Sequence, residues 1–110
     1  MAISAYGTIG YYENVLEHDP SSSEDVKLFM IPGMMHCAGG NGPWYVNWVD
    51  ELDKWVTGKD QLNQLTGVFI GEGLKPTGTR LICPYPDLTM YKGEGEIKEV
   101  KSYECQQLKK

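Results

Sequence analysis

The chain has 110 residues and a mass of 12.4 kDa, which limits it to one domain with a small hydrophobic core. Its 10 basic and 15 acidic side chains give a net charge of −5 at pH 7, and an acidic surface repels nucleic acid. We therefore expect no nucleic-acid partner. There is neither an apolar run of the roughly 20 residues that a membrane span needs nor a signal peptide, so we also expect no membrane partner and no export signal in this chain.

The first predicted elements are a helix and a strand. Residues 7–18 predict a short amphipathic helix, because apolar side chains recur at helical spacing after Thr8, a suitable N-cap. A polar connection over residues 19–25 follows. Residues 26–31 (VKLFMI) are short, apolar and β-favouring, which predicts a buried strand. A buried strand between two helices is typical of an open, mostly parallel sheet, so the expected fold class is α/β.

A glycine-rich loop, residues 31–44 (IPGMMHCAGGNGPW), follows this strand and places His36 beside Cys37. The carboxyl end of a strand is the usual place for a site in such a sheet. One interpretation is that His36 makes an ordinary hydrogen bond within the loop. However, four glycines and two prolines fix an unusual backbone path, and rigid loops hold proton-transfer groups. We therefore expect His36 to act as a general base.

A second amphipathic helix is predicted to begin at Pro43 and to end before Gly58, a suitable C′ residue. Core-facing helices bury aromatic side chains for their area, so its apolar stripe is interpreted as core packing rather than as a ligand cage. The stripe consists of Tyr45, Trp48, Val49, Leu52, Trp55 and Val56.

Beyond residue 58 the pattern changes to an irregular β tail. The sequence Gly93-Glu-Gly95 is expected to be a turn, because it lacks the spacing of a phosphate-binding loop and the helix that should follow one. Short strand-like pieces are predicted at residues 67–70, 80–83 and 88–91, with turns at residues 71–73, 76–78 and 84–86.

The three cysteines, Cys37, Cys83 and Cys105, are widely spaced and include no C-x-x-C pair, so no metal site is expected. An odd number suggests one bridge and one sulfur with a partner outside the chain. Neighbouring residues rarely have the geometry of a catalytic Cys–His pair, so we expect Cys37 to form a disulfide rather than to act as a nucleophile. Such a disulfide would fix the position of the His36 imidazole. Cys83 and Cys105 would then bridge each other, which is worth roughly 3 kcal/mol in the chain-entropy model.

Four spaced blocks of the sequence together resemble the tannase and feruloyl esterase family of α/β-hydrolases. They are LFMIPGMMHCAGGNGPW, WVTGK, RLICPYP and YKGEG, and with the first helix the likeness extends from Thr8 to Cys105. The resemblance implies a serine carboxylesterase that acts on phenolic esters, with no cofactor or metal bound by this portion. It also implies a parent protein that is secreted or periplasmic.

For individual residues, the resemblance implies that His36 is the histidine of a Ser-Asp-His triad. It would take a proton from the serine and return it to the leaving alcohol. Cys37 would pair with a cysteine directly before that serine, and the triad aspartate would lie at or just upstream of position 1. The chain has no G-x-S-x-G or C-S elbow, and neither Ser4 nor the serines at positions 21–23 lie on one.

We therefore expect a single partial domain that corresponds to the last fifth or so of an esterase. Residues 1–58 would be the hydrolase-core segment with the strand and the histidine loop, and residues 59–110 the disulfide-stapled tail. The first hypothesis is that an amino-terminal segment of the same esterase completes the site, without which the chain is inactive. The second is a non-catalytic α+β module, possibly a homodimer through Cys37. The third is hydrolysis of activated esters by His36 alone.

Overall fold

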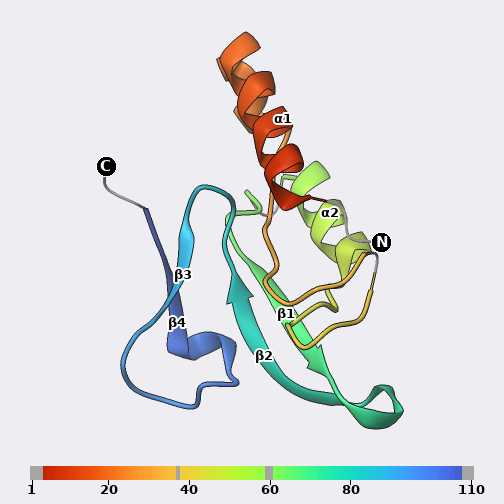
Figure 1. Cartoon of the computed structure of the whole chain (residues 1–110). Helices are drawn as coiled ribbons and strands as arrows, with labels where there is room; N and C mark the ends of the chain where they lie inside the picture. Colours follow the sequence, from red (N-terminus) through yellow and green to blue (C-terminus); the bar gives the residue numbers. More distant parts are fainter. Residues whose placement is uncertain (1–3, 37, 59–60, 108–110) are drawn as a thin grey trace.

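The computed structural model of the chain describes residues 4–36, 38–58 and 61–107. In this part of the chain two α-helices precede four short strands, and α1 projects from the rest of the molecule (Figure 1). Neither described helix has the length and apolar character needed to cross a bilayer. The elements are α1 (Ala5–His18), α2 (Trp48–Val56), β1 (Leu65–Ile70), β2 (Pro76–Ile82), β3 (Leu88–Tyr91) and β4 (Tyr103–Gln106).

The first predicted helix is confirmed as α1, but it begins earlier than expected. Ser4 is the N-cap residue and its side chain makes no capping hydrogen bond, so the prediction of Thr8 as the cap was wrong. Ala5 and Tyr6 extend the helix toward the amino terminus. Tyr12 is the buried residue of α1, and its ring meets that of Tyr85 edge-on, with the centroids 6.0 Å apart.

The strand predicted at residues 26–31 is not formed. Phe29 makes an isolated antiparallel bridge to Pro84, and most of the segment is half-buried. These residues favour an extended backbone, as predicted, but a strand also needs a continuous hydrogen-bonded neighbour. Among the described residues, this extended segment has a single β-bridge, and beside it the Tyr85 amide donates a hydrogen bond to the Leu28 carbonyl at 2.7 Å.

The second predicted helix is confirmed only from Trp48 onward. Asn47 is its N-cap, and the Asn47 side chain accepts a hydrogen bond from the Asp50 amide at 3.4 Å. Pro43 lies outside the helix and is fully buried, so its assignment to the first helical turn was wrong. The physical reason is that residues 43–46 pack against β1 instead. The predicted C-terminal glycine is correct, because Gly58 has a φ of +76° and its amide donates to the Trp55 carbonyl.

The apolar stripe of α2 is mostly exposed, which corrects the prediction that it belongs to the core. Val49 is 80% exposed and Val56 is 77% exposed, whereas Trp55 is half-buried and packs against the core. The helix therefore has the amphipathic pattern that the sequence indicates. However, no other element in the described part of the chain covers most of its apolar face. The core itself contains Val46, Leu62, Leu65 and Ile82, flanked by Phe29, Ile31 and Trp55.

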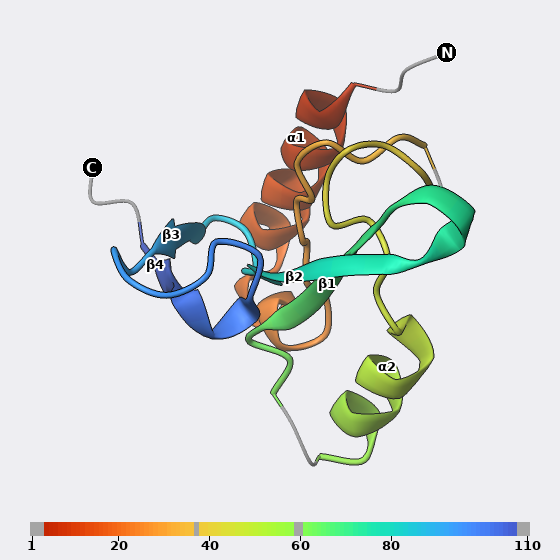
Figure 2. The same cartoon turned by 90° about the horizontal axis from the view of Figure 1, so that it is seen from below.

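The strands form two antiparallel pairs instead of the expected parallel sheet. β1 pairs with β2, with Leu65 opposite Ile82 and an irregularity between Phe69 and Ile70. The 76–78 segment lies inside β2, so the turn predicted there was wrong. The strand-like pieces predicted at residues 67–70, 80–83 and 88–91 are confirmed as parts of β1, β2 and β3, except for Cys83. β3 pairs with β4, a strand that the sequence analysis missed. The two helices lie on opposite sides of the β1–β2 hairpin (Figure 2).

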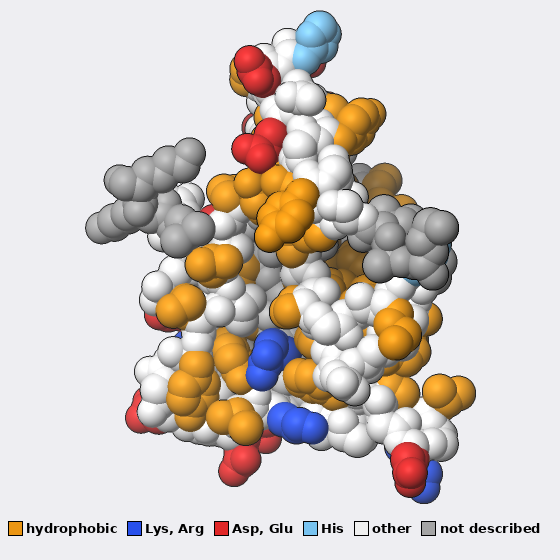
Figure 3. Space-filling model, viewed as in Figure 1, with side chains coloured by type: hydrophobic (Ala, Val, Ile, Leu, Met, Phe, Trp, Pro, Cys, Tyr) orange, Lys and Arg blue, Asp and Glu red, His pale blue; other side chains and the backbone are white. Residues whose placement is uncertain are grey.

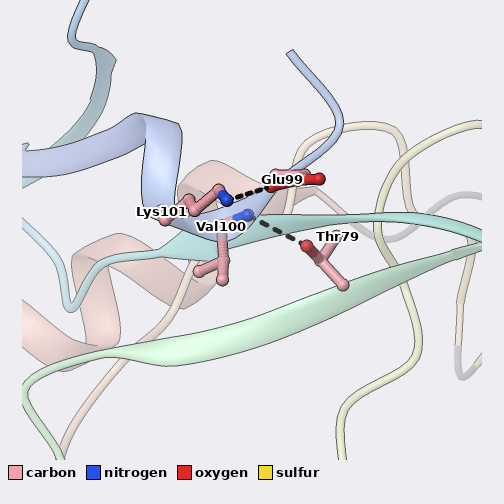
Figure 4. A network of polar contacts seen from close by, with 4 residues as sticks. All are labelled: Thr79, Glu99, Val100 and Lys101. Atoms are coloured by element: carbon pink, nitrogen blue, oxygen red, sulfur yellow. Dashed lines mark hydrogen bonds and ion pairs between the residues drawn. The ribbon is translucent and has the colours of Figure 1, made fainter. Parts of the chain in front are cut away.

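Covalent and polar contacts hold the two strand pairs together. Cys83, directly after β2, forms the predicted disulfide with Cys105 of β4. Two further hydrogen bonds join β2 to the segment before β4: the Thr79 amide donates to the Lys98 carbonyl at 2.8 Å, and the Val100 amide donates to the Thr79 hydroxyl at 2.9 Å (Figure 4). The irregular tail is therefore fastened to β2 at several points.

Candidate active site

His36 lies on the loop between the extended segment and α2, and its side chain is exposed. The backbone on either side of it is hydrogen-bonded within the loop. The Met35 amide donates to the Gly39 carbonyl, and the Ala38 amide donates to the His36 carbonyl, both at 2.9 Å. An exposed imidazole on an internally bonded loop has the access to solvent and the fixed backbone that a general base requires.

Two glycines show why the loop needs residues without a side chain. Gly40 has a φ of +106°, a conformation that other residues adopt only at a cost, and a Cβ there would also collide with the Gly33 carbonyl oxygen. A Cβ on Gly42 would collide with the Pro32 carbonyl oxygen. The loop closes on itself through the hydrogen bond from the Gly42 amide to the Gly33 carbonyl at 2.9 Å. The sequence correctly indicated an unusual backbone path.

Both arms of the loop are attached to the rest of the described structure. On the later arm, Pro43 packs over Gly67 of β1, where a Cβ would lie 2.5 Å from the Pro43 carbonyl oxygen. Tyr45 and Val68 then form an antiparallel bridge, with amide-to-carbonyl distances of 3.3 and 2.8 Å. On the earlier arm, the bridge of Phe29 serves the same purpose. The position of His36 is thus set by β1 and by the segment after β2.

The predicted cysteine sites have different outcomes. Cys83 and Cys105 are bonded to each other with an S–S distance of 2.04 Å, and Cys83 is buried. The Thr89 hydroxyl lies 3.2 Å from the Cys83 sulfur and 2.9 Å from the Leu81 carbonyl. Cys37 lies outside the described residues, so its partner stays a prediction. Since the other two cysteines bond to each other, Cys37 has no further cysteine of this chain with which to pair.

The serines near α1 occupy a capping turn that has nothing in common with a nucleophile elbow. The Ser21 hydroxyl donates to the Asp19 carboxylate at 2.6 Å, and the Ser22 hydroxyl donates to the Asp19 carbonyl at 2.7 Å. These contacts close the 3₁₀ turn after α1. In the described ranges, no group of three or more His, Cys, Asp or Glu side chains is placed to hold a metal ion.

A large groove of about 1090 Å³ lies beside the base of the histidine loop, which contributes Pro32 and Gly33 to its wall. Apolar residues of α1 form one side, and residues of β2 and β3 with the segment between them form the other. His36 is not one of the lining residues. Figure 3 shows hydrophobic side chains gathered on the face below α1, with basic side chains among them. The groove was not foreseen from the sequence.

Two polar groups of this groove also escaped the sequence analysis. Arg80 of β2 lines it, and the signal that could have revealed this residue is a single cation within the apolar stretch RLIC. Tyr85 lines it too. Desolvation, and secondarily the charge and hydrogen bonding of the neighbouring Glu13 carboxylate, raise the pKa of the Tyr85 phenol above its ordinary value.

The chain is similar to known proteins in sequence and in fold. Residues 1–106 match the family described as tannase and feruloyl esterase. The chain belongs to this family. It is 34% identical over 109 residues to the mono(2-hydroxyethyl) terephthalate hydrolase of Piscinibacter sakaiensis, covering 94% of this chain and 18% of that protein. It is also 27% identical to feruloyl esterase C of Talaromyces stipitatus, covering 86% of this chain and 22% of that protein.

The likeness extends to three dimensions. The crystal structure of an esterase from Aspergillus oryzae matches with a TM-score of 0.80 and 26% identity, over 94% of this chain and 25% of that one. This match supports the expected class, a portion of an α/β-hydrolase. The tannase-family chain spans about a fifth of the length of the curated relatives that it matches.

Proposed function

We propose that this chain supplies the catalytic histidine of a serine ester hydrolase. Two observations support the proposal: the chain belongs to the tannase and feruloyl esterase family, and His36 is exposed on a loop whose backbone is fixed on both sides. The second observation carries it, because a general base must be both accessible and held in place.

In the proposed reaction, His36 accepts the proton of a serine hydroxyl as the serine oxygen attacks the ester carbonyl. The imidazolium then donates this proton to the leaving alcohol. A water molecule attacks the acyl-enzyme with His36 again as the base, which releases the acid and regenerates the serine. The serine, the orienting aspartate and the oxyanion hole would come from another polypeptide segment, so we expect the chain alone to be inactive.

Cys37 has a mechanical role in this proposal. A disulfide from Cys37 to a cysteine next to the nucleophilic serine would hold serine and histidine at a fixed separation. The bond between Cys83 and Cys105 supports this idea, because it leaves the third cysteine of the chain for an outside partner. Disulfides persist in oxidising compartments, so we place the working protein outside the cytoplasm, secreted or periplasmic.

The proposed substrates are esters of aromatic acids, including phenolic ones. Two relatives, a feruloyl esterase and a mono(2-hydroxyethyl) terephthalate hydrolase, are named for esters whose acyl groups both contain a benzene ring. Reconstitution tests the proposal. The part of the Piscinibacter sakaiensis hydrolase that this chain does not match is co-expressed with this chain, and the combination is assayed with mono(2-hydroxyethyl) terephthalate and methyl ferulate. We expect hydrolysis by the combination and by neither part alone; equal hydrolysis by this chain alone would contradict the proposal.

A second candidate function is a non-catalytic module that pairs with another copy of itself. The exposed apolar stripe of α2 favours it, since large exposed apolar surfaces mark interaction sites. Electrophoresis of the purified chain without reductant separates the two candidates. A band at twice the monomer mass that disappears with reductant and with Cys37→Ser supports the homodimer, and a heavier disulfide-linked partner from the native source supports the two-part esterase.

A further inference from the structure

The groove between α1 and the β2–β3 region is lined by Arg80, whose side chain carries a buried donor with no acceptor among the described residues. The Nε atom of Arg80 is buried, and it has no hydrogen-bond partner among the described residues. The rest of the guanidinium group is better satisfied, because one terminal nitrogen donates to the Tyr103 hydroxyl at 3.1 Å. A buried donor without an acceptor destabilises the folded protein, so a functional complex is expected to provide an acceptor.

Neighbouring side chains hold the guanidinium group in place. Its central carbon lies 5.4 Å from the ring centre of Phe69 and 5.0 Å from that of Tyr103, both within the range of cation–π contacts. The Tyr103 hydroxyl in turn donates to the Ile97 carbonyl at 2.5 Å. The hydrogen bond from the Val100 amide to the Thr79 hydroxyl, which Figure 4 shows, fastens this neighbouring segment to β2. Arg80 is therefore a positioned cation.

The acidic residues that line the groove do not neutralise this cation. Glu13 and Asp87 line the same groove, but neither carboxylate lies within 4.0 Å of Arg80 in the described structure. The Glu13 carboxylate instead interacts with Tyr85. Arg80 thus lines, without an acidic partner among the described residues, a groove whose walls are otherwise largely apolar.

We propose that this groove is the docking site of an apolar segment from the amino-terminal part of the esterase, and that this segment brings an aspartate or glutamate to Arg80. A carboxylate suits the site because guanidinium–carboxylate hydrogen bonds are charge-assisted and can be bidentate. A protein segment suits a groove of about 1090 Å³ that is lined by residues of α1 and β2. The relatives also contain about four-fifths of their length beyond the part that this chain matches. The inference rests on the proposed two-part esterase.

Peptide binding tests this proposal without requiring catalysis. Overlapping peptides that cover the amino-terminal part of the Piscinibacter sakaiensis hydrolase are immobilised and probed with the labelled full chain. We expect the strongest binders to combine an apolar run with one aspartate or glutamate. Replacing that acid by its amide should weaken binding at least tenfold, and Arg80→Met in the chain should abolish the difference between the acid and amide peptides.

Lys98→Met is the matched control. Lys98 also lies over the Phe69 ring, at 5.1 Å, but it is exposed and does not line the groove, so its loss should leave binding unchanged. Circular dichroism confirms that each variant is folded. The proposal is overturned if no peptide binds, if the binders lack an acid, or if Arg80→Met and Lys98→Met behave alike. Because no hydrolysis is measured, loss of the proposed catalytic role of His36 would leave these results unaffected.

Discussion

The backbone of Gly42 packs directly against the carbonyl group of Pro32, so the two ends of the histidine loop meet without room for a side chain. We predict that Gly42→Ala lowers the free energy of unfolding by about 1–3 kcal/mol, the usual cost of overpacking. Gly10→Ala is the control, because Gly10 lies in α1 and a Cβ added there would meet nothing within 4 Å. That change should raise helix stability by up to about 1 kcal/mol. Urea unfolding measures both, and a neutral Gly42→Ala would show that the loop is not closed in this way.

Tyr85 should ionise at higher pH than an ordinary tyrosine. Burial disfavours the phenolate first, and the Glu13 carboxylate adds to this effect, so the pKa in the folded state lies above that of the unfolded chain. The resulting stabilisation is fully present below a pH of about 10 and is lost as the pH rises through the folded-state pKa. Absorbance at alkaline pH follows the titration. Tyr85→Phe should remove the late component, and Glu13→Gln should shift it only partly toward the ordinary value, because desolvation remains.

The bond between Cys83 and Cys105 should account for a large part of the stability of this small chain. The two residues are 22 positions apart, and a loop of this size is worth about 3 kcal/mol in the chain-entropy model. Cys105→Ala should therefore lower the free energy of unfolding by about that amount in urea, under non-reducing conditions. Cys37→Ala is the comparison and should have a much smaller effect on the isolated chain. Equal losses in the two variants would contradict this distribution of roles.

The exposed stripe of α2 should cause self-association when nothing else covers it. Val49 and Val56 are the most exposed members of the stripe, so the double substitution Val49→Lys/Val56→Lys removes apolar area without removing core contacts. We expect the unmodified chain to show concentration-dependent association in sedimentation velocity, and the double variant to remain monomeric in reductant. Trp55→Ala is a contrasting variant that should lower stability, because Trp55 packs against the core.

Local sequence patterns predicted the elements whose stabilising contacts lie nearby. α1 and the later turns of α2 follow from 3.6-residue periodicity, and Gly58 ends α2 in the left-handed conformation that glycine favours. The bond between Cys83 and Cys105 was predicted from the odd number of cysteines together with the assignment of Cys37 to a partner outside the chain.

Predictions that depended on distant partners were less successful. Residues 26–31 have the composition of a buried strand but have only one bridge to pair with, so the pattern could not reveal that the ladder is missing. Pro43 suits a helix start, yet its burial against Gly67 fixes another conformation. Arg80 lies in the RLICPYP motif, but the sequence did not predict a role for it, because the groove that it lines is formed by segments far apart in the chain. No periodicity records such an assembly.

The central claim is that the exposed imidazole of His36 is the general base of an ester hydrolase. The most direct measurement is kcat/KM of the reconstituted two-part esterase with mono(2-hydroxyethyl) terephthalate, for His36→Ala and for His18→Ala. His18 is the other histidine of the chain and lies exposed at the end of α1, so it serves as the matched control. We predict a loss of about 10⁴-fold or more for His36→Ala, as for other triad members, and a change of less than about twofold for His18→Ala. Retention of activity by His36→Ala, or equal losses in both variants, would contradict the account.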